Sequence, residues 1–117
     1  MSDSQPTDGR TRSARIAALN DRLRTTLADG KVMMTAGVQA CGSTFVAKAI
    51  SAMQTFTAFD ADNDPYHEHD FGAFEVDGHH LFFKIDYYSP DMESGSEDPA
   101  DSTKTVRVLT LMLAEEY

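Results

Sequence analysis

The stretch "FGAFEVDGHHLFFKIDYY", residues 71–88, has the pattern of a β-hairpin. Apolar and polar residues alternate on both sides of Asp77-Gly78, a dipeptide that favours the two left-handed positions of a type I′ turn. The resulting register pairs Val76 with His79, Phe74 with Leu81 and Gly72 with Phe83. We therefore predict two antiparallel strands joined by a two-residue turn.

The alternation gives the hairpin one apolar and one polar face. The apolar face holds Phe74, Val76, Leu81, Phe83 and Ile85, and the polar face holds Glu75, His80, Phe82, Lys84 and Asp86. The apolar set is predicted to pack on the core. Phe82 does not fit the polar face, so we expect either a loop to cover it or a contact surface to include it.

Ahead of the hairpin, four apolar residues recur at spacings of three and four, as on one side of an α-helix: Ile16, Leu19, Leu23 and Leu27. Ser13 is a suitable N-cap and Asp29-Gly30 a suitable end, so we predict a helix between them that packs this stripe on the sheet. Its solvated side is predicted to carry the cations Arg15, Arg22 and Arg24.

Two further segments complete the first half of the chain. The run "KVMMTAGV", residues 31–38, is short and apolar, and we predict a strand, although its Met and Ala residues are compatible with a helix. Apolar residues at helical spacing over residues 43–56 predict a second amphipathic helix with Ser43 as N-cap. Cys41 is the only cysteine, so no internal disulfide can form.

The second half of the chain closes with a strand that follows a long loop. Residues 89–104, "SPDMESGSEDPADSTK", predict an irregular connection, and residues 106–113 are apolar on both alternating faces, as in a strand inside a sheet. We therefore predict an α+β fold with two helices packed on an antiparallel or mixed sheet of about four strands. This single domain spans residues 13–117 and follows a flexible polar tail over residues 1–12.

Acidic residues concentrate in one part of the chain. Residues 57–103 carry thirteen Asp and Glu against one lysine, Lys84, and the whole chain has a net charge of −9. Such a segment repels nucleic-acid phosphates and attracts basic protein surfaces, so we expect no direct binding of nucleic acid. The sequence also lacks a secretory signal and an apolar run of the roughly 20 residues that span a bilayer. We therefore expect a cytoplasmic protein without membrane contact.

The densest acidic stretch is "DADNDPYHEHD", residues 60–70. Asp60, Asp62 and Asp64 alternate like the first three ligands of an EF-hand, and this spacing suits a hard cation such as calcium. Pro65 and Phe71 then stand where that loop needs a glycine and a bidentate glutamate. The EF-hand is rejected, and a weaker calcium site is kept only as an alternative.

His67 and His69 form an H-x-H pair in the same stretch. Together with Asp64 and Asp70 they offer ligands for zinc, but the match to the H-x-H-x-D-H signature of metallohydrolases fails, since Asp70 is one position early and the closing histidine is missing. We favour a structural role in which Tyr66, His69 and Asp70 anchor the loop. No nucleophile has an adjacent base, and no glycine-rich phosphate loop is present, so the sequence predicts no catalytic residue, no metal and no cofactor.

The stretches "DNDPYHEHDFGAFEVDG", "LFFKIDYYSPD" and "RVLTLMLAEEY" resemble a family of small uncharacterised bacterial proteins, the domain-of-unknown-function family 3768. The likeness extends from about Arg15 to Tyr117. It implies an origin in alphaproteobacteria, often on plasmids or other mobile elements, and it implies no activity. Residues 62–66 and 68–72 match the family's loop, whereas His67 departs from it. An H-x-H pair peculiar to this chain cannot be a mechanism that the family shares.

Two classes of function follow. The first is a non-enzymatic interaction protein whose acidic surface binds a basic surface of a partner. The resemblance implies that this partner is a nucleic-acid-handling protein of host defence, inhibited in an anti-restriction or anti-CRISPR manner. The expected binding residues are Asp60, Asp62, Asp64, Glu68, Asp91, Glu93, Glu97, Asp98 and Asp101. The second class is a metal-dependent hydrolase or calcium-binding module that uses residues 60–70, and a regulator of plasmid maintenance is a third, less defined alternative.

Overall fold

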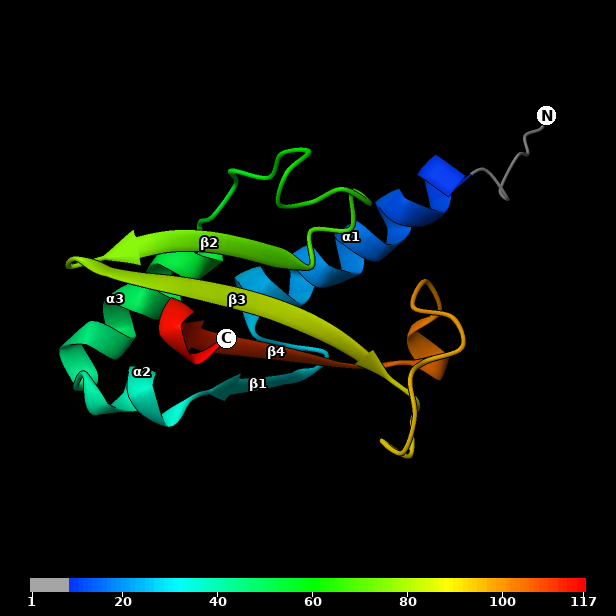
Figure 1. Cartoon of the computed structure of the whole chain (residues 1–117). Coiled ribbons are helices and arrows are strands. Elements are labelled where there is room, and N and C mark those ends of the chain that lie inside the picture. Colours follow the sequence, from blue (N-terminus) through cyan, green and yellow to red (C-terminus); the bar gives the residue numbers. More distant parts are fainter. Residues whose placement is uncertain (1–8) are drawn as a thin grey trace.

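The computed structural model describes residues 9–117 (Figure 1). Helices and strands follow in the order α1 (Gly9–Thr26), β1 (Lys31–Met34), α2 (Ala36–Ala40), α3 (Ser43–Gln54), β2 (Phe71–Val76), β3 (His79–Tyr88) and β4 (Val106–Leu113). Two short 3-10 helices, η1 (Ser102–Lys104) and η2 (Ala114–Glu116), flank β4. None of the helices in this part of the chain combines the length and the apolar character needed to cross a membrane.

The four strands form one mixed sheet in the order β1-β4-β3-β2. The pairs β2–β3 and β3–β4 are antiparallel, whereas the short β1 runs parallel to β4. The position of β4 inside the sheet explains why its residues are apolar on both faces. The predicted α+β class and four-stranded sheet are confirmed, and the sheet is of the mixed kind.

The hairpin forms in the predicted register, with Val76 opposite His79 and Gly72 opposite Phe83. Asp77 and Gly78 adopt φ values of 50° and 84°, the left-handed conformation that a type I′ turn requires. The alternation is confirmed as well, because the residues predicted for the apolar face are the more deeply buried set.

The core lies between this apolar face and two helices, α1 and α3 (Figure 1). Leu23 of α1 and Met53 of α3 are fully buried and pack with Phe83 at the centre of the sheet. The Phe83 ring meets the Phe56 ring edge-on, with centroids 5.5 Å apart. Gly72 allows this packing, since a Cβ there would stand 2.3 Å from the Phe83 ring.

The opposite face of the sheet carries a small aromatic cluster. The centroid of the Phe82 ring lies 5.0 Å from that of Phe71 and 5.4 Å from that of Tyr117. These neighbours leave Phe82 half-buried on a face that it shares with the ion pair between Lys84 and Asp86. The side chains of Phe71 and Tyr117, rather than a loop, thus cover Phe82.

Helix α1 differs from its predicted limits at both ends. It begins at Gly9, so Ser13 lies inside the helix and is not its N-cap. Of the stretch 1–12 predicted as a flexible tail, residues 1–8 lie outside the described residues. The helix ends at Thr26 because Leu27 adopts a left-handed φ of 61°, and Leu27 is therefore 37% exposed instead of buried.

Arg24 lies on the buried side of α1, contrary to the prediction that it is solvated. It is 4% exposed, whereas Arg15 and Arg22 are exposed as predicted. Helical geometry explains the difference, because residues four apart share one side of a helix. Position 24 follows Ile16 and Asn20 at this interval, and both of these are buried.

The segment predicted as one strand over residues 31–38 splits after Met34. Only Lys31–Met34 is a strand, and Thr35 then caps the short α2, where its hydroxyl accepts a hydrogen bond from the Val38 N–H at 3.5 Å. The described chain therefore has three α-helices instead of two. Gly42, with a φ of 96°, is the N-cap of α3, so Ser43 is the first residue of that helix and not its cap.

We predict that Leu23→Ala lowers the free energy of unfolding by about 2–5 kcal/mol, because it leaves a cavity between α1 and the sheet. Leu27→Ala is the control, since it shortens a leucine next to the same helix that is 37% exposed and should cost far less. Urea unfolding followed by circular dichroism measures both losses. Equal losses for the two variants would contradict the packing of α1.

Candidate functional site

The loop over residues 57–70 joins α3 to β2 and lies beside α1 (Figure 1). In its first half, side chains of the loop form hydrogen bonds with the loop's own backbone. Asp60 accepts hydrogen bonds from the N–H groups of Asp62 and Asn63 at 2.9 and 3.0 Å. Asn63 accepts from the Asp60 N–H at 3.1 Å and donates to the Ala58 carbonyl oxygen at 3.2 Å. These Asx-type turns fix the backbone of the loop.

Asp64 is a buried carboxylate at the centre of the loop and is 2% exposed. Its Oδ1 accepts hydrogen bonds from the N–H groups of Glu68 and His69 at 2.9 and 3.1 Å. His67 and His69 both adopt a left-handed φ, of 59° and 57°, which residues other than glycine rarely take. The hydrogen bonds to Asp64 therefore hold a strained backbone in place.

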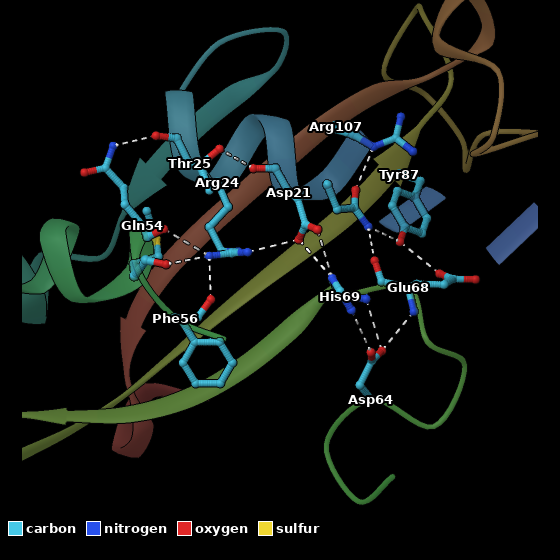
Figure 2. Close-up of polar contacts among 12 residues, drawn as sticks. Asp21, Arg24, Thr25, Gln54, Phe56, Asp64, Glu68, His69, Tyr87 and Arg107 are labelled. Carbon is cyan, nitrogen blue, oxygen red and sulfur yellow. Dashed lines mark hydrogen bonds and ion pairs between the residues drawn. The ribbon is translucent and has the colours of Figure 1, made fainter. Parts of the chain in front are cut away.

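The His69 ring connects the loop to α1 (Figure 2). Its Nδ1 lies 3.0 and 3.1 Å from the two carboxylate oxygens of Asp21, and its Nε2 lies 3.8 Å from Oδ2 of Asp64. The ring also stacks flat on Phe59, with centroids 4.0 Å apart. Because both ring nitrogens face carboxylates, one on α1 and one in the loop, His69 anchors the loop to the helix.

Arg24 extends this chain of contacts to the end of α3 (Figure 2). Its Nη2 donates to Asp21 at 3.0 Å, and its Nη1 donates to the carbonyl oxygens of Met53 and Phe56, each at 3.0 Å. The C-terminus of a helix leaves such carbonyl groups without partners and favours a cation through the helix dipole. The guanidinium group also lies over the Phe59 ring, 5.3 Å from its centroid.

A second set of hydrogen bonds centres on Asn20, which is fully buried. Its Nδ2 donates to the Glu68 carbonyl oxygen at 2.9 Å and to the Tyr87 hydroxyl at 2.8 Å, and its Oδ1 accepts from Nε of Arg107 at 2.7 Å. Burial raises the pKa of Tyr87, so its hydroxyl stays protonated and donates to Oε1 of Glu68 at 2.9 Å. Asn20 thus joins α1 to the loop, β3 and β4.

An apolar groove of about 750 Å³ runs between α1 and this loop. It is lined by Ser13, Ala14, Ala17, Ala18, Asp21, Tyr66, His67 and His69. The side chain of Tyr66 is 74% exposed at the rim. Contrary to the prediction from the sequence, Tyr66 therefore does not anchor the loop but stands out from it.

Asp70 ends the loop, and its backbone carbonyl accepts a hydrogen bond from the Ile85 N–H at 2.8 Å. Its half-buried carboxylate has no side-chain partner in the described part of the chain. Burial raises the pKa of this carboxyl group, and the nearby charges of Glu68, Asp64 and Asp86 raise it further. Asp70 therefore anchors the loop through its backbone while its negative charge opposes folding.

The second acidic stretch lies in the loop over residues 89–104 and contacts the N-terminal half of α1. Asp98 pairs with Arg12 of α1 at 2.8 Å, and the hydrogen bond from Arg12 lowers the pKa of Asp98. Glu97 pairs with Lys104 at 3.4 Å. Cations from outside the acidic segment thus neutralise part of its charge.

The nine acids expected to bind a partner differ in exposure. Asp64 is buried, and three others are half-buried: Glu68, Asp98 and Asp101. The exposed ones are Asp60, Asp62, Asp91, Glu93 and Glu97. The acidic surface is therefore made by fewer residues than the sequence suggests.

No three His, Cys, Asp or Glu side chains among the described residues converge to hold a metal ion. Of the alternative ligands Asp64, His67, His69 and Asp70, only Asp64 and His69 lie side by side. The Oδ1 atoms of Asp60 and Asp64 accept hydrogen bonds from the backbone N–H groups of the loop. The observed geometry therefore favours neither the calcium site nor the hydrolase site.

The family described as "Protein of unknown function (DUF3768)" matches residues 34–116, a span that includes the hairpin and both acidic loops. The chain belongs to this family. No curated protein and no solved structure matches the chain. In this DUF3768 member, the α1 residues that fasten the loop precede the matched span: Asn20, Asp21 and Arg24.

Sequence reasoning did not identify the residues on α1 and the sheet that hold the site: Asn20, Asp21, Arg24, Tyr87 and Arg107. A signal for Asn20 exists, since it follows Ile16 by four positions and precedes Leu23 by three, inside the apolar stripe. A polar residue at such a position needs a buried partner. Its partners come from loops and strands far along the chain and carry no comparable local signal.

We predict that Arg24→Met destabilises the protein by about 1–3 kcal/mol, because the Phe56 carbonyl oxygen loses its donor and Asp21 loses its ion-pair partner. Arg22→Met is the matched control on the same helix, since it removes an exposed ion pair with Asp29, and such surface pairs contribute little to stability. Urea unfolding measures both changes, and hydrogen exchange should show a less protected loop only in Arg24→Met. A cost for Arg22→Met as large as that for Arg24→Met would refute this role.

We predict that Asp70→Asn raises the melting temperature at pH 7. The pKa of Asp70 is raised in the folded protein above its ordinary value of 3.8, so its ionisation costs stability as pH rises through and above that value. The gain should shrink as pH is lowered towards 3.8. Melting curves across this range test it, with the exposed Asp62→Asn as the control. A gain independent of pH, or a loss at pH 7, would contradict the unfavourable charge.

Proposed function

We propose that the protein is a non-enzymatic interaction module that binds a basic surface of a partner protein through the loop over residues 57–70 and the adjoining groove. The observation that carries this proposal is the 74% exposed Tyr66. It stands between Asp64, which accepts hydrogen bonds from the loop backbone, and His69, which contacts Asp21 of α1. An aromatic side chain on a rigid support loses little conformational entropy on binding, and such residues dominate the energy of protein interfaces.

The groove beside Tyr66 complements this ring. Ala14, Ala17 and Ala18 leave room above α1, so an apolar side chain of the partner fits next to the tyrosine. Asp60 and Asp62 are exposed on the same loop and supply negative charge. These features fit a partner segment in which apolar side chains stand beside lysine or arginine.

Charge supports the same kind of partner. The chain has a net charge of −9, and exposed carboxylates occur on both acidic loops. Opposite charges speed the association of two proteins, and salt weakens the effect. Asp64 is left out of the binding surface because its carboxylate serves the backbone of its own loop.

The sequence resemblance supports a narrower proposal for the partner, a nucleic-acid-binding protein of host defence that this module inhibits on behalf of a mobile element. Proteins that bind nucleic acid carry lysine and arginine on the surface that meets the phosphates. Such a surface complements exposed carboxylates. In this proposal the two proteins meet in the cytoplasm, and the module itself binds neither nucleic acid nor membrane.

We predict that Tyr66→Ala weakens binding about 30-fold, as expected for the loss of a residue that dominates an interface. Affinity capture from host lysate followed by mass spectrometry identifies the partner, and surface plasmon resonance with the purified partner measures the rates. The double variant Asp60→Asn with Asp62→Asn should slow association at low salt and reduce its salt dependence.

The matched control is the double variant Glu75→Gln with Glu115→Gln, which removes the same charge from exposed positions on β2 and η2. It should change the association rate less than the loop variant does. Binding that is unaffected by Tyr66→Ala, or equally sensitive to both charge variants, would show that the interface lies elsewhere.

A further inference from the structure

Arg107 is a buried cation without a carboxylate partner in the described part of the chain. It is 4% exposed. Its Nε donates to Asn20 at 2.7 Å, its Nη2 donates to the Pro99 carbonyl oxygen, and its guanidinium group lies 5.2 Å from the centroid of the Tyr87 ring. All three of these partners are neutral.

This environment offsets the charge of Arg107 only in part. Burying an ion is unfavourable unless an opposite charge offsets it, and burial lowers the pKa of Arg107 accordingly. The chain has nineteen Asp and Glu residues, yet the nearby Glu68 is connected to Arg107 only through Tyr87 and Asn20. Among the described residues, no carboxylate pairs directly with Arg107, and Glu68 acts on its charge only from a distance.

A pocket of about 510 Å³ lies beside this guanidinium group and is lined by Leu19, Arg22, Asp29, Ser102, Thr105 and Arg107. Figure 2 shows a terminal nitrogen of Arg107 pointing away from Tyr87 and Glu68. Among the described residues, Nη1 of Arg107 has no hydrogen-bond acceptor, since the bonds of this side chain are made by Nε and Nη2. The pocket is thus lined by a side chain with one donor that has no acceptor among the described residues.

The charges that line the pocket add up to an excess of one positive charge. Asp29 is the only acid in the lining, and it pairs with Arg22 at the exposed rim. Arg107 has no such counterpart. The exposed hydroxyl of Ser102 adds a neutral donor to the same pocket.

We propose that this pocket binds a small molecule through an oxyanionic group, a carboxylate or a phosphate. Arg107 compensates the charge of the anion and donates through Nη1, Ser102 donates through its hydroxyl, and Arg22 offsets the negative charge of Asp29 at the rim. Leu19 contacts the apolar part of the ligand. The volume lies within the range of small-molecule sites, and no residue of this pocket lines the Tyr66 groove.

A purely structural role for Arg107 accounts for only part of these observations. Its Nε and Nη2 join α1 to the loop over residues 89–104 and explain why the side chain is buried. They do not explain the unpartnered Nη1, the missing counter-charge or the pocket. The two roles differ in one respect that can be measured, which is saturable binding of an anion.

The test is a titration of the full chain, labelled with ¹⁵N, with inorganic phosphate and separately with acetate, each against chloride at equal ionic strength. We expect saturable NMR shifts at the backbone amides of Ser102 and Thr105 and at Nε of Arg107. The stronger of the two titrations identifies the preferred anionic group. Shifts that do not saturate below about 10 mM, or that centre on other residues, would overturn the proposal.

Substitutions of exposed residues at the rim of the pocket test the proposal without disturbing the fold. Ser102→Ala and Arg22→Gln should each weaken binding about two- to tenfold, as expected for the loss of one donor or charge. Lys104→Gln removes an exposed cation next to the pocket but outside its lining, and it should leave the affinity unchanged. Equal losses for Arg22→Gln and Lys104→Gln would show non-specific attraction of anions. Arg107→Lys should abolish the shifts, and if it does not fold, the rim variants decide.

Discussion

The buried guanidinium group of Arg24 is the contact on which the arrangement of the molecule depends (Figure 2). Where α1 passes the C-terminus of α3, Arg24 donates to the carbonyl oxygens of Met53 and Phe56 and pairs with Asp21. Its planar group presents several donors at fixed angles, whereas an apolar side chain would leave the Phe56 carbonyl oxygen without this donor. Asp21 binds His69 in turn, and the acidic loop follows. Arg24 therefore contributes both to the packing of two helices and, through Asp21, to the position of the loop that carries Tyr66.

The hairpin and the two long helices could be predicted because their signals are local. Asp77-Gly78 specifies a turn, the alternation around it specifies faces, and apolar spacing specifies helices. The errors at the helix ends have the same origin. Whether a helix stops at Leu27 or starts after Gly42 depends on the φ of one residue, which composition does not determine. The parallel pairing of β1 with β4 could not be predicted for a different reason, since it joins segments far apart in the chain.

The candidate site could be predicted only as a region. Composition identifies the loop over residues 60–70, but it does not separate Asp62 from Asp64, which have the same side chain two positions apart. One is exposed and the other accepts hydrogen bonds from the backbone of its own loop. Arg22 and Arg24 differ in the same way, through helical phase. The charge of a segment therefore overstates its surface charge wherever the fold uses carboxylates as internal acceptors.

Helix α1 contributes to the Tyr66 groove and to the Arg107 pocket through different residues, and its buried face supports both. Asn20 donates to the backbone of the acidic loop and accepts from Arg107, so replacing it would disturb the two surfaces together. A loss of binding in such a variant would not locate an interface. Tyr66 and Ser102 are exposed and lie outside the contacts that fasten α1, so their substitution changes a surface while the architecture stays in place. Tyr66 and Ser102 can therefore report on function while the residues that build the fold stay unchanged.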